Sequence, residues 1–201
     1  MENVILASTP PGEIITYGTY PQTADVADRT PIKWRVLQNS GRELFILSEY
    51  ILDCRRYHGE CVDITWRDCD LRKWLNNEFY NTAFNAAEKG FIKTTCCTGN
   101  GEGSPDTEDK VFLLSVTEIK DLSDLHGKDL RRAVGTDFAK TKKTMDAAYM
   151  YMIKRTKITI SSETAKKSAV PGGGCEHKEI SLRVRFLSVQ AVVFAAMRMS
   201  A

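Results

Sequence analysis

The chain has 201 residues, of which 42% are hydrophobic and 27% charged, with eight Phe, seven Tyr and three Trp. This composition excludes a largely disordered chain and supplies enough apolar side chains for one folded domain without disulfide staples. The formal net charge is only +2, but residues 1–125 carry 13 Lys and Arg against 20 Asp and Glu, whereas residues 126–201 carry 15 against 6.

The uneven charge allows two interpretations. The basic last third could meet an acidic partner or a nucleic acid, or it could neutralise the acidic first part within one fold. Its Lys and Arg residues are dispersed without interleaved aromatic side chains, which favours neutralisation and argues against nucleic acid as the partner. No signal-peptide pattern is visible, and no apolar run approaches the ~20 residues of a membrane-spanning helix. We therefore expect no membrane insertion, while the compartment stays open.

The first predicted elements are β-strands. After a flexible lead-in over residues 1–11, residues 14–20 are rich in β-branched and aromatic side chains. Residues 32–37 alternate apolar and polar side chains, which is typical of a half-buried strand. A turn signal at 39–42 leads into an apolar strand at 44–47, so we expect a hairpin here.

An amphipathic helix follows. We expect it to begin near Thr65, with Thr65 or Asp68 as its cap, and to break near Asn81. A second short helix is predicted at 85–92. The three Trp residues of the chain, one of them in the 32–37 strand, are expected to be core anchors. The apolar face of the first helix consists of Trp66, Leu71, Trp74, Leu75, Phe79 and Phe84.

Regular patterning weakens further along the chain. Residues 98–105 form a loop rich in Gly, and 111–115 read as a buried strand. A helix is predicted within 137–151, with Phe138, Met145, Ala148 and Tyr149 directed inward. Residues 154–179 form a long irregular segment, and such segments inside compact domains are usually functional or disordered. Two strand-like runs follow, at 182–189 and 192–199.

The order of these motifs resembles a bacterial family of domains of unknown function, family 6273. The resemblance covers residues 12–120, continues weakly at 136–140 and 193–198, and lacks the Trp-Trp-Leu-Arg-Ser stretch that the family usually carries before its last strands; residues 167–172 occupy about that place. The motifs that carry it are 18–22, 32–37, 71–80 and 111–115.

The resemblance implies a fold and a role. Members look similar to C-type-lectin-like domains, including the variable proteins of diversity-generating retroelements, in which a fixed scaffold holds a hypervariable C-terminal segment. We therefore expect a single C-type-lectin-like α+β domain over residues 12–201, with antiparallel strands, two helices and an irregular segment at about 150–190. Its expected role is non-enzymatic binding of a protein or glycan ligand, without a cofactor. The alternatives are an enzyme of the formylglycine-generating type and a structural or assembly subunit of a phage or cell surface.

The predicted ligand-binding residues lie in the irregular segment, because binding residues concentrate on irregular backbone and charged or hydroxyl side chains supply hydrogen bonds there. A solvated loop without a ligand is the competing interpretation. The predicted residues are Lys154, Arg155, Lys157, Thr159, Ser161, Ser162, Lys166, Lys167, His177, Arg183 and Arg185.

Four other patterns are weighed as chemistry and not favoured. Cys54, His58, Cys61 and Cys69 are residue types that bind zinc, but their spacing fits no standard finger, so we expect mostly free thiols. The neighbours Cys175 and His177 have no evident orienting carboxylate beyond Glu176 or Glu179, and the Gly run at 172–174 lacks the Lys and Ser or Thr of a phosphate loop. A calcium site would need better spacing than the oxygen-bearing cluster offers, which consists of Asn100, Glu102, Asp106, Glu108 and Asp109.

Overall fold

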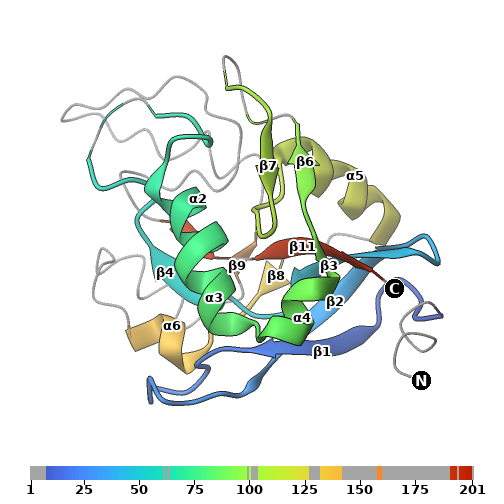
Figure 1. Cartoon of the computed structure of the whole chain (residues 1–201), viewed down its shortest axis with the longest axis horizontal. Coiled ribbons are helices and arrows are strands. Elements are labelled where there is room, and N and C mark those ends of the chain that lie inside the picture. The colour runs from blue at the N-terminus through green and yellow to red at the C-terminus, as the bar shows by residue number, and fades with distance from the viewer. Residues whose placement is uncertain are drawn as a thin grey trace.

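The computed structural model describes residues 8–60, 62, 64–98, 100, 104–126, 132–141, 158–159, 191–193 and 195–200. Within them the fold mixes helices with antiparallel ladders, so the predicted α+β class is confirmed (Figure 1). A five-stranded sheet runs in the order β1-β2-β3-β11-β5. Its strands are β1 (Ile14–Thr19), β2 (Pro31–Asn39), β3 (Glu43–Ser48), β11 (Ala196–Ser200) and β5 (Ile92–Lys93).

The first half of this sheet follows the sequence closely. Strands β1 to β3 form a meander at the three predicted positions, and Trp34 lies at the centre of β2 with no exposed surface. The turn between β2 and β3 uses Gly41 at φ 77°, a backbone conformation that side chains with a Cβ rarely adopt. Hydrophobic alternation and turn chemistry therefore determine this part of the fold.

Strand β11 enters the sheet from far along the chain. It pairs with β3 over five residues and with β5 over two, and Met197 and Met199 are buried. The predicted run at 192–199 is thus two strands, β10 (Ala191–Val193) and β11, because β10 leaves the large sheet to pair with β4 (Asp53–Arg55). The predicted strand at 182–189 lies outside the described residues.

The helical layer packs on one face of the sheet (Figure 1). Helix α2 (Asp70–Trp74) continues through a π-helical turn, η1 (Leu75–Phe79), into α3 (Tyr80–Ala83). Phe79 contacts Tyr20, with ring centroids 5.1 Å apart, and Phe84 stacks on Trp34 at 6.4 Å. The three Trp residues are buried as predicted, since Trp74, the most exposed of them, keeps only 8% of its surface.

The start of this helix differs from the prediction. The N-cap is Cys69, whose sulfur accepts from the backbone N–H of Arg72, so neither Thr65 nor Asp68 caps α2. Thr65 instead accepts from the backbone of Asp68 and Cys69 in a separate turn. Thiols rarely cap helices, and the usual cap preference therefore misplaced the start. The predicted second helix is confirmed as α4 (Ala86–Phe91), where Asn85 and Glu88 form a capping box.

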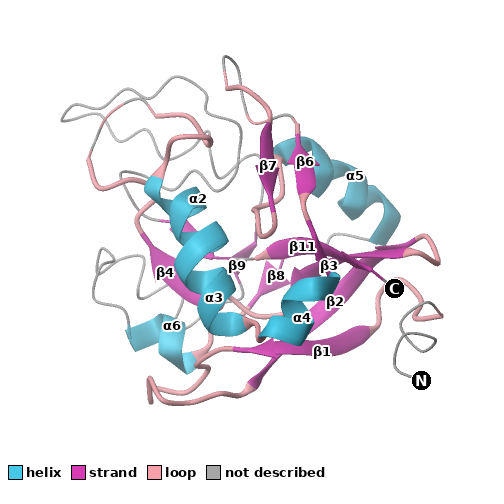
Figure 2. Ribbon diagram, in the orientation of Figure 1, coloured by secondary structure: helices cyan, strands magenta, loops and turns pink. Residues whose placement is uncertain are grey.

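Residues 95–126 depart further from the prediction. A hairpin of β6 (Thr95–Cys97) and β7 (Thr107–Asp109) projects above the sheet in the view of Figure 2. The predicted strand at 111–115 is wrong: these residues are buried, but only Phe112 makes a bridge, with Ala196. Helix α5 (Val116–His126), which was not predicted, follows a cap at Ser115. The four apolar residues at 111–114 fit buried coil as well as strand, since burial alone sets such a composition.

Short elements complete the described fold. The predicted helix at 137–151 is seen as α6 (Asp137–Thr141), with Phe138 buried; Met145, Ala148 and Tyr149 lie outside the described residues. Strand β8 (Arg132–Ala133) pairs with β9 (Ile158–Thr159), which falls within the segment predicted to be irregular. Among the described residues, no helix is both long enough and apolar enough to cross a membrane.

Candidate functional site

An open groove of about 580 Å³ lies between strand β4 and the helix formed by α2 and η1. Cys54, Leu71 and Trp74 line its inner wall and are buried. The remaining described lining is polar, and both signs of charge meet there within one small surface. Its exposed or half-exposed side chains are Arg55, Arg56, Asp70, Lys73, Asn77 and Glu78.

Arg55 is held in place by two contacts. Its guanidinium carbon lies 4.0 Å from the centroid of the Trp74 ring, a cation–π geometry. Its Nε lies 3.4 Å from Oδ2 of Asp53, while the Arg55 side chain keeps 39% of its surface. The guanidinium is therefore oriented before any ligand arrives, and it is still accessible from the groove.

Asp53 supports Arg55 from below. Its side chain is fully buried and accepts from the Tyr20 hydroxyl at 2.7 Å and from the backbone N–H of Cys54 at 2.7 Å. Burial, reinforced by the Asp53 carboxylate, raises the pKa of Tyr20, so this hydroxyl stays a hydrogen-bond donor. A buried carboxylate with these partners is a structural anchor for the β4 strand.

Asp70 occupies the rim at the first turn of α2. Its Oδ2 accepts from the backbone N–H of Gly59 at 2.9 Å and lies 2.9 Å from Nδ1 of His58, although those two atoms are not aligned as a hydrogen bond. Lys73 lies 3.6 Å from the other oxygen. The hydrogen bond from Gly59, with the His58 and Lys73 charges, lowers the pKa of Asp70. Asp70 thus ties the 56–60 loop to the helix.

The π-helical turn places two groove residues, Asn77 and Glu78. Such turns widen an α-helix by one residue and recur at functional sites. Asn76 lies in this turn, and its Nδ2 donates to the Arg72 carbonyl at 3.1 Å and to the Val111 carbonyl at 2.9 Å. Its Oδ1 accepts from the backbone N–H of Lys110 at 2.7 Å. One amide side chain therefore fixes the distorted turn against the segment after β7.

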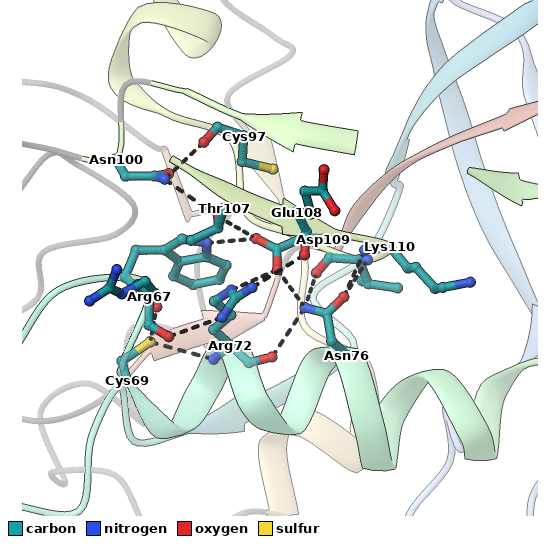
Figure 3. A network of polar contacts seen from close by, with 12 residues as sticks. Arg67, Cys69, Arg72, Asn76, Cys97, Asn100, Thr107, Glu108, Asp109 and Lys110 are labelled. Carbon is teal, nitrogen blue, oxygen red and sulfur yellow. Dashed lines mark hydrogen bonds and ion pairs between the residues drawn. The ribbon is translucent and has the colours of Figure 1, made fainter. Parts of the chain in front are cut away.

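The far side of the same helix is fastened by a buried carboxylate (Figure 3). Asp109 has 1% of its surface exposed, and its oxygens accept from Arg72 Nε at 2.6 Å, Trp66 Nε1 at 2.9 Å and Thr107 Oγ1 at 2.8 Å. Asn76 also reaches it, at 3.3 Å. Arg72 and Asn76 therefore hold α2 and η1 from one side, while the groove residues project from the other.

The oxygen-bearing cluster that was not favoured as a calcium site is partly used to hold the helix. Asn100 is 2% exposed and donates to the Cys97 and Pro105 carbonyls, and Asp109 serves the helix as described above. Asp106 and Glu108 are exposed, and Glu102 lies outside the described residues. Across the described ranges, no group of three or more His, Cys, Asp or Glu side chains is arranged to hold a metal ion.

The cysteines considered above as zinc ligands have different structural roles. Cys54 lines the groove wall, whereas Cys69 caps α2 and donates from its Sγ to the Trp66 carbonyl at 3.3 Å. Cys54, Cys69, Cys96 and Cys97 are free thiols, and burial raises the pKa of Cys69. Cys61, Cys175 and His177, with the Gly run at 172–174, lie outside the described residues.

Of the predicted ligand-binding residues, Thr159 is the one that falls within the described part of the chain. Thr159 lies in β9, opposite Arg132. The predicted residues Lys154, Arg155, Lys157, Ser161, Ser162, Lys166, Lys167, His177, Arg183 and Arg185 lie outside the described residues. Strand β10, which comes directly after residues 150–190 in the sequence, lies beside the groove, because Ala191 pairs with Arg55 and Val192 with Cys54.

The groove residues themselves were not predicted from the sequence. Arg55, Arg56 and Asp70 fall between clear elements, and Asn77 and Glu78 sit on a helix whose outer face carries no distinctive pattern. The signal that points toward them is the pair Asn76-Asn77 inside an otherwise regular helix, since Asn is a weak helix former and marks irregularity.

The geometry defines a class of protein: an α+β domain that carries a preformed polar groove on the outside of an antiparallel core. A family model described as a domain of unknown function, DUF6273, matches residues 41–149, which is more than half of the chain. The chain therefore belongs to the DUF6273 family. No curated protein and no solved structure matches it.

Proposed function

We propose that this protein is a non-enzymatic ligand-binding domain with a C-type-lectin-like fold, whose binding surface combines the β4–α2 groove with the residues predicted within 150–190. The observation that carries the proposal is the pairing of β10 with β4. Ala191 lies opposite Arg55, so the described strand that comes next in the sequence after 150–190 lies at the wall of the groove. The strand that follows the predicted binding segment therefore pairs with the strand that forms the groove wall.

The chemistry of the groove supports recognition. Donors and acceptors both line the groove, Arg55 is preoriented over Trp74, and the π-helical turn carries Asn77 and Glu78. Sites that fix a polar ligand use a few well-placed charged and amide groups on rigid elements in this way. The ligand we propose is a protein or glycan, as expected for a display domain of the kind used by diversity-generating retroelement variable proteins.

A binding screen tests the proposal. The full chain is applied to a glycan array and to a panel of immobilised proteins, beside the variant Asn77→Trp, which fills the groove from an exposed position. We expect a set of ligands that the wild type retains and Asn77→Trp loses. The matched control is Lys120→Trp, an exposed position on helix α5 away from the groove, which should bind like the wild type.

Two results would contradict the proposal. If the folded chain retains no glycan and no protein, the binding role is wrong. If ligands are found but Asn77→Trp keeps all of them, the binding surface lies elsewhere. Circular dichroism of the variants separates loss of binding from loss of fold.

A further inference from the structure

We propose that the groove holds its ligand through a carboxylate group, bound by Arg55 and Arg56, and that this ligand is an acidic sugar. The inference rests on the proposed binding function and names the chemistry of its ligand. It follows from which charged groups of the groove already have protein partners.

The two carboxylates nearest the groove wall are occupied. Asp53 is buried and accepts from Tyr20, from the Cys54 backbone and from Arg55. Asp70 accepts from the Gly59 backbone and lies beside His58 and Lys73. Protein donors already occupy part of the acceptor positions of both carboxylates, so fewer are left to bind a cationic ligand.

The two guanidinium groups keep unused donors. Arg55 has more N–H groups than Asp53 and the Tyr20 hydroxyl can accept, and its stacking on Trp74 keeps the fork in one orientation. Arg56 is exposed and makes no side-chain hydrogen bond or ion pair with any residue in the described part of the chain. An incoming anion can therefore pair with both without breaking a protein contact.

The surrounding charge selects a monoanion. Glu78 and Asp70 stand on the same rim, and they repel a doubly charged phosphate about twice as strongly as a singly charged carboxylate. A carboxylate carries one charge, is planar and matches the guanidinium fork with two parallel hydrogen bonds. Charge and shape together favour a carboxylate over other oxyanions.

The rest of the groove carries polar side chains that can bind hydroxyl groups. Leu71 and Trp74 are 1% and 8% exposed, and the Trp74 ring is covered by Arg55. Leu71 and Trp74 therefore offer little exposed surface to an apolar side chain of a peptide. Asn77 offers a donor and an acceptor, and Glu78 offers acceptors, which are the groups that bind sugar hydroxyls. These features favour a sugar acid over a peptide terminus.

Nuclear magnetic resonance titration of the full chain tests the inference, with matched probes. D-Glucuronate is compared with D-glucose, which lacks the carboxylate, and with glucose 6-phosphate, which carries two charges. The fourth probe is a short N-acetylated peptide with uncharged side chains that ends in a carboxylate. We expect D-glucuronate to shift the amide signals of the 55–59 loop and of Asn77 at millimolar concentration. D-Glucose should bind at least about tenfold more weakly, since a charge-assisted pair is lost.

Variants separate the roles of the two arginines. Arg56→Met removes a side chain without described partners, so folding should be intact while D-glucuronate binding weakens about tenfold. Arg55→Lys keeps the charge next to Asp53 but loses the fork, and a similar loss is expected. Arg42→Met, on the exposed turn after β2, is the matched control and should leave binding unchanged.

Each alternative result of the titrations contradicts one stated part of the proposal. Equal binding of D-glucose and D-glucuronate rules out the carboxylate contact but leaves the groove as a binding site. Unchanged binding by Arg56→Met rules out Arg56 as a contact, and unchanged binding by Arg55→Lys rules out the bidentate contact of Arg55. Tighter binding of glucose 6-phosphate rejects the monoanion, and preference for the peptide rejects the sugar. If no probe shifts the groove signals, this inference is wrong, and the array screen decides the binding function on its own.

Discussion

Arg72 donates from Nε to Oδ1 of Asp109 across 2.6 Å, and this ion pair joins helix α2 to strand β7. Asp109 is buried, whereas the Arg72 side chain keeps 22% of its surface. The pair belongs to a network with Trp66, Thr107 and Asn76 that leaves the carboxylate fully hydrogen-bonded. The groove residues are positioned by this network although none of them belongs to it.

The first prediction concerns Asp109→Asn, which keeps the shape and removes the charge. We expect the free energy of unfolding to fall by about 3 kcal/mol, since a buried pair loses one partner and the amide nitrogen meets donors. Urea unfolding followed by Trp fluorescence measures this loss as a lower midpoint with an unchanged slope. Asp106→Asn, an exposed change just before β7, should stay within about 0.5 kcal/mol of the wild type. Equal stability of both variants would show that the network does not hold the helix.

The second prediction compares three glycines. Gly18 has φ 65°, and a Cβ there would lie 2.6 Å from the Phe84 ring and 2.8 Å from the Ala83 carbonyl oxygen. Gly18→Ala should therefore cost about 3 kcal/mol or more, through strain and a clash with packed atoms. Gly41→Ala has the strain without the clash, at φ 77°, and should cost about 1 kcal/mol.

Gly90 completes the comparison, because a Cβ there meets open space inside helix α4. Gly90→Ala should stabilise the protein by about 0.5–1 kcal/mol through helix propensity. Thermal unfolding of the three variants gives the order directly. A Gly18→Ala protein as stable as the wild type would mean that α3 and β1 are packed less closely than the structure has them.

The third prediction concerns acid stability and Asp28. Its carboxylate accepts from the Thr30 hydroxyl and from the backbone N–H groups of Gln22, Thr23 and Thr30, and these hydrogen bonds, the Thr30 hydroxyl first, lower its pKa. A pKa that is lower in the folded state stabilises the protein above the unfolded pKa, and this contribution is lost as the pH falls toward the folded value.

Asp28→Asn should therefore be less stable than the wild type at pH 7, and the difference should shrink below about pH 4, the ordinary Asp range. Melting temperatures of both proteins from pH 7 to pH 2 measure it. Asp106→Asn, at an exposed side chain that accepts no hydrogen bond from the described residues, is the comparison variant. A constant difference across this range would assign the effect of Asp28 to loop geometry and not to its charge.

The fourth prediction concerns thiol reactivity. Cys96 is exposed on β6, whereas Cys54, Cys69 and Cys97 are buried, and burial raises the pKa of Cys69. Because the thiolate is the reacting form, iodoacetamide should label Cys96 in the native protein and leave the three buried thiols unmodified until urea is added. Peptide mass spectrometry identifies the labelled sites, and Cys96→Ser should remove the fast modification among these four. Rapid native labelling of Cys69 would show that the cap of α2 opens.

The parts of the fold that follow from local rules were predictable. The meander of β1 to β3 follows from alternation around Trp34 and a turn at Gly41, and α4 follows from the Asn85 and Glu88 capping box. Helix α5 carries a similar signal, since Ser115 accepts from the Glu118 backbone and Glu118 accepts from the Ser115 backbone. Ser115 is thus the cap of a helix and not the end of the predicted strand at 111–115.

The groove depends on contacts that no local pattern encodes. The Arg55 guanidinium is oriented by its contacts with Trp74, which lies on another element, and with Asp53. The η1 turn is held by Asn76, which accepts a hydrogen bond from the backbone of Lys110. Sequence periodicity describes one element at a time and cannot place these partners together. For the same reason, the pairing of β10 with β4, on which the proposed function depends, could not be predicted from the sequence.

The position of β11 has a consequence for synthesis of the protein. A ribosome completes β1, β2 and β3 long before it reaches residues 196–200, so the Leu44–Leu47 side of β3 waits without its neighbour. An unpaired, apolar strand edge is a template for association with other chains. Slow translation, or a nascent chain stalled after β5, should therefore increase the demand for chaperones that shield this edge.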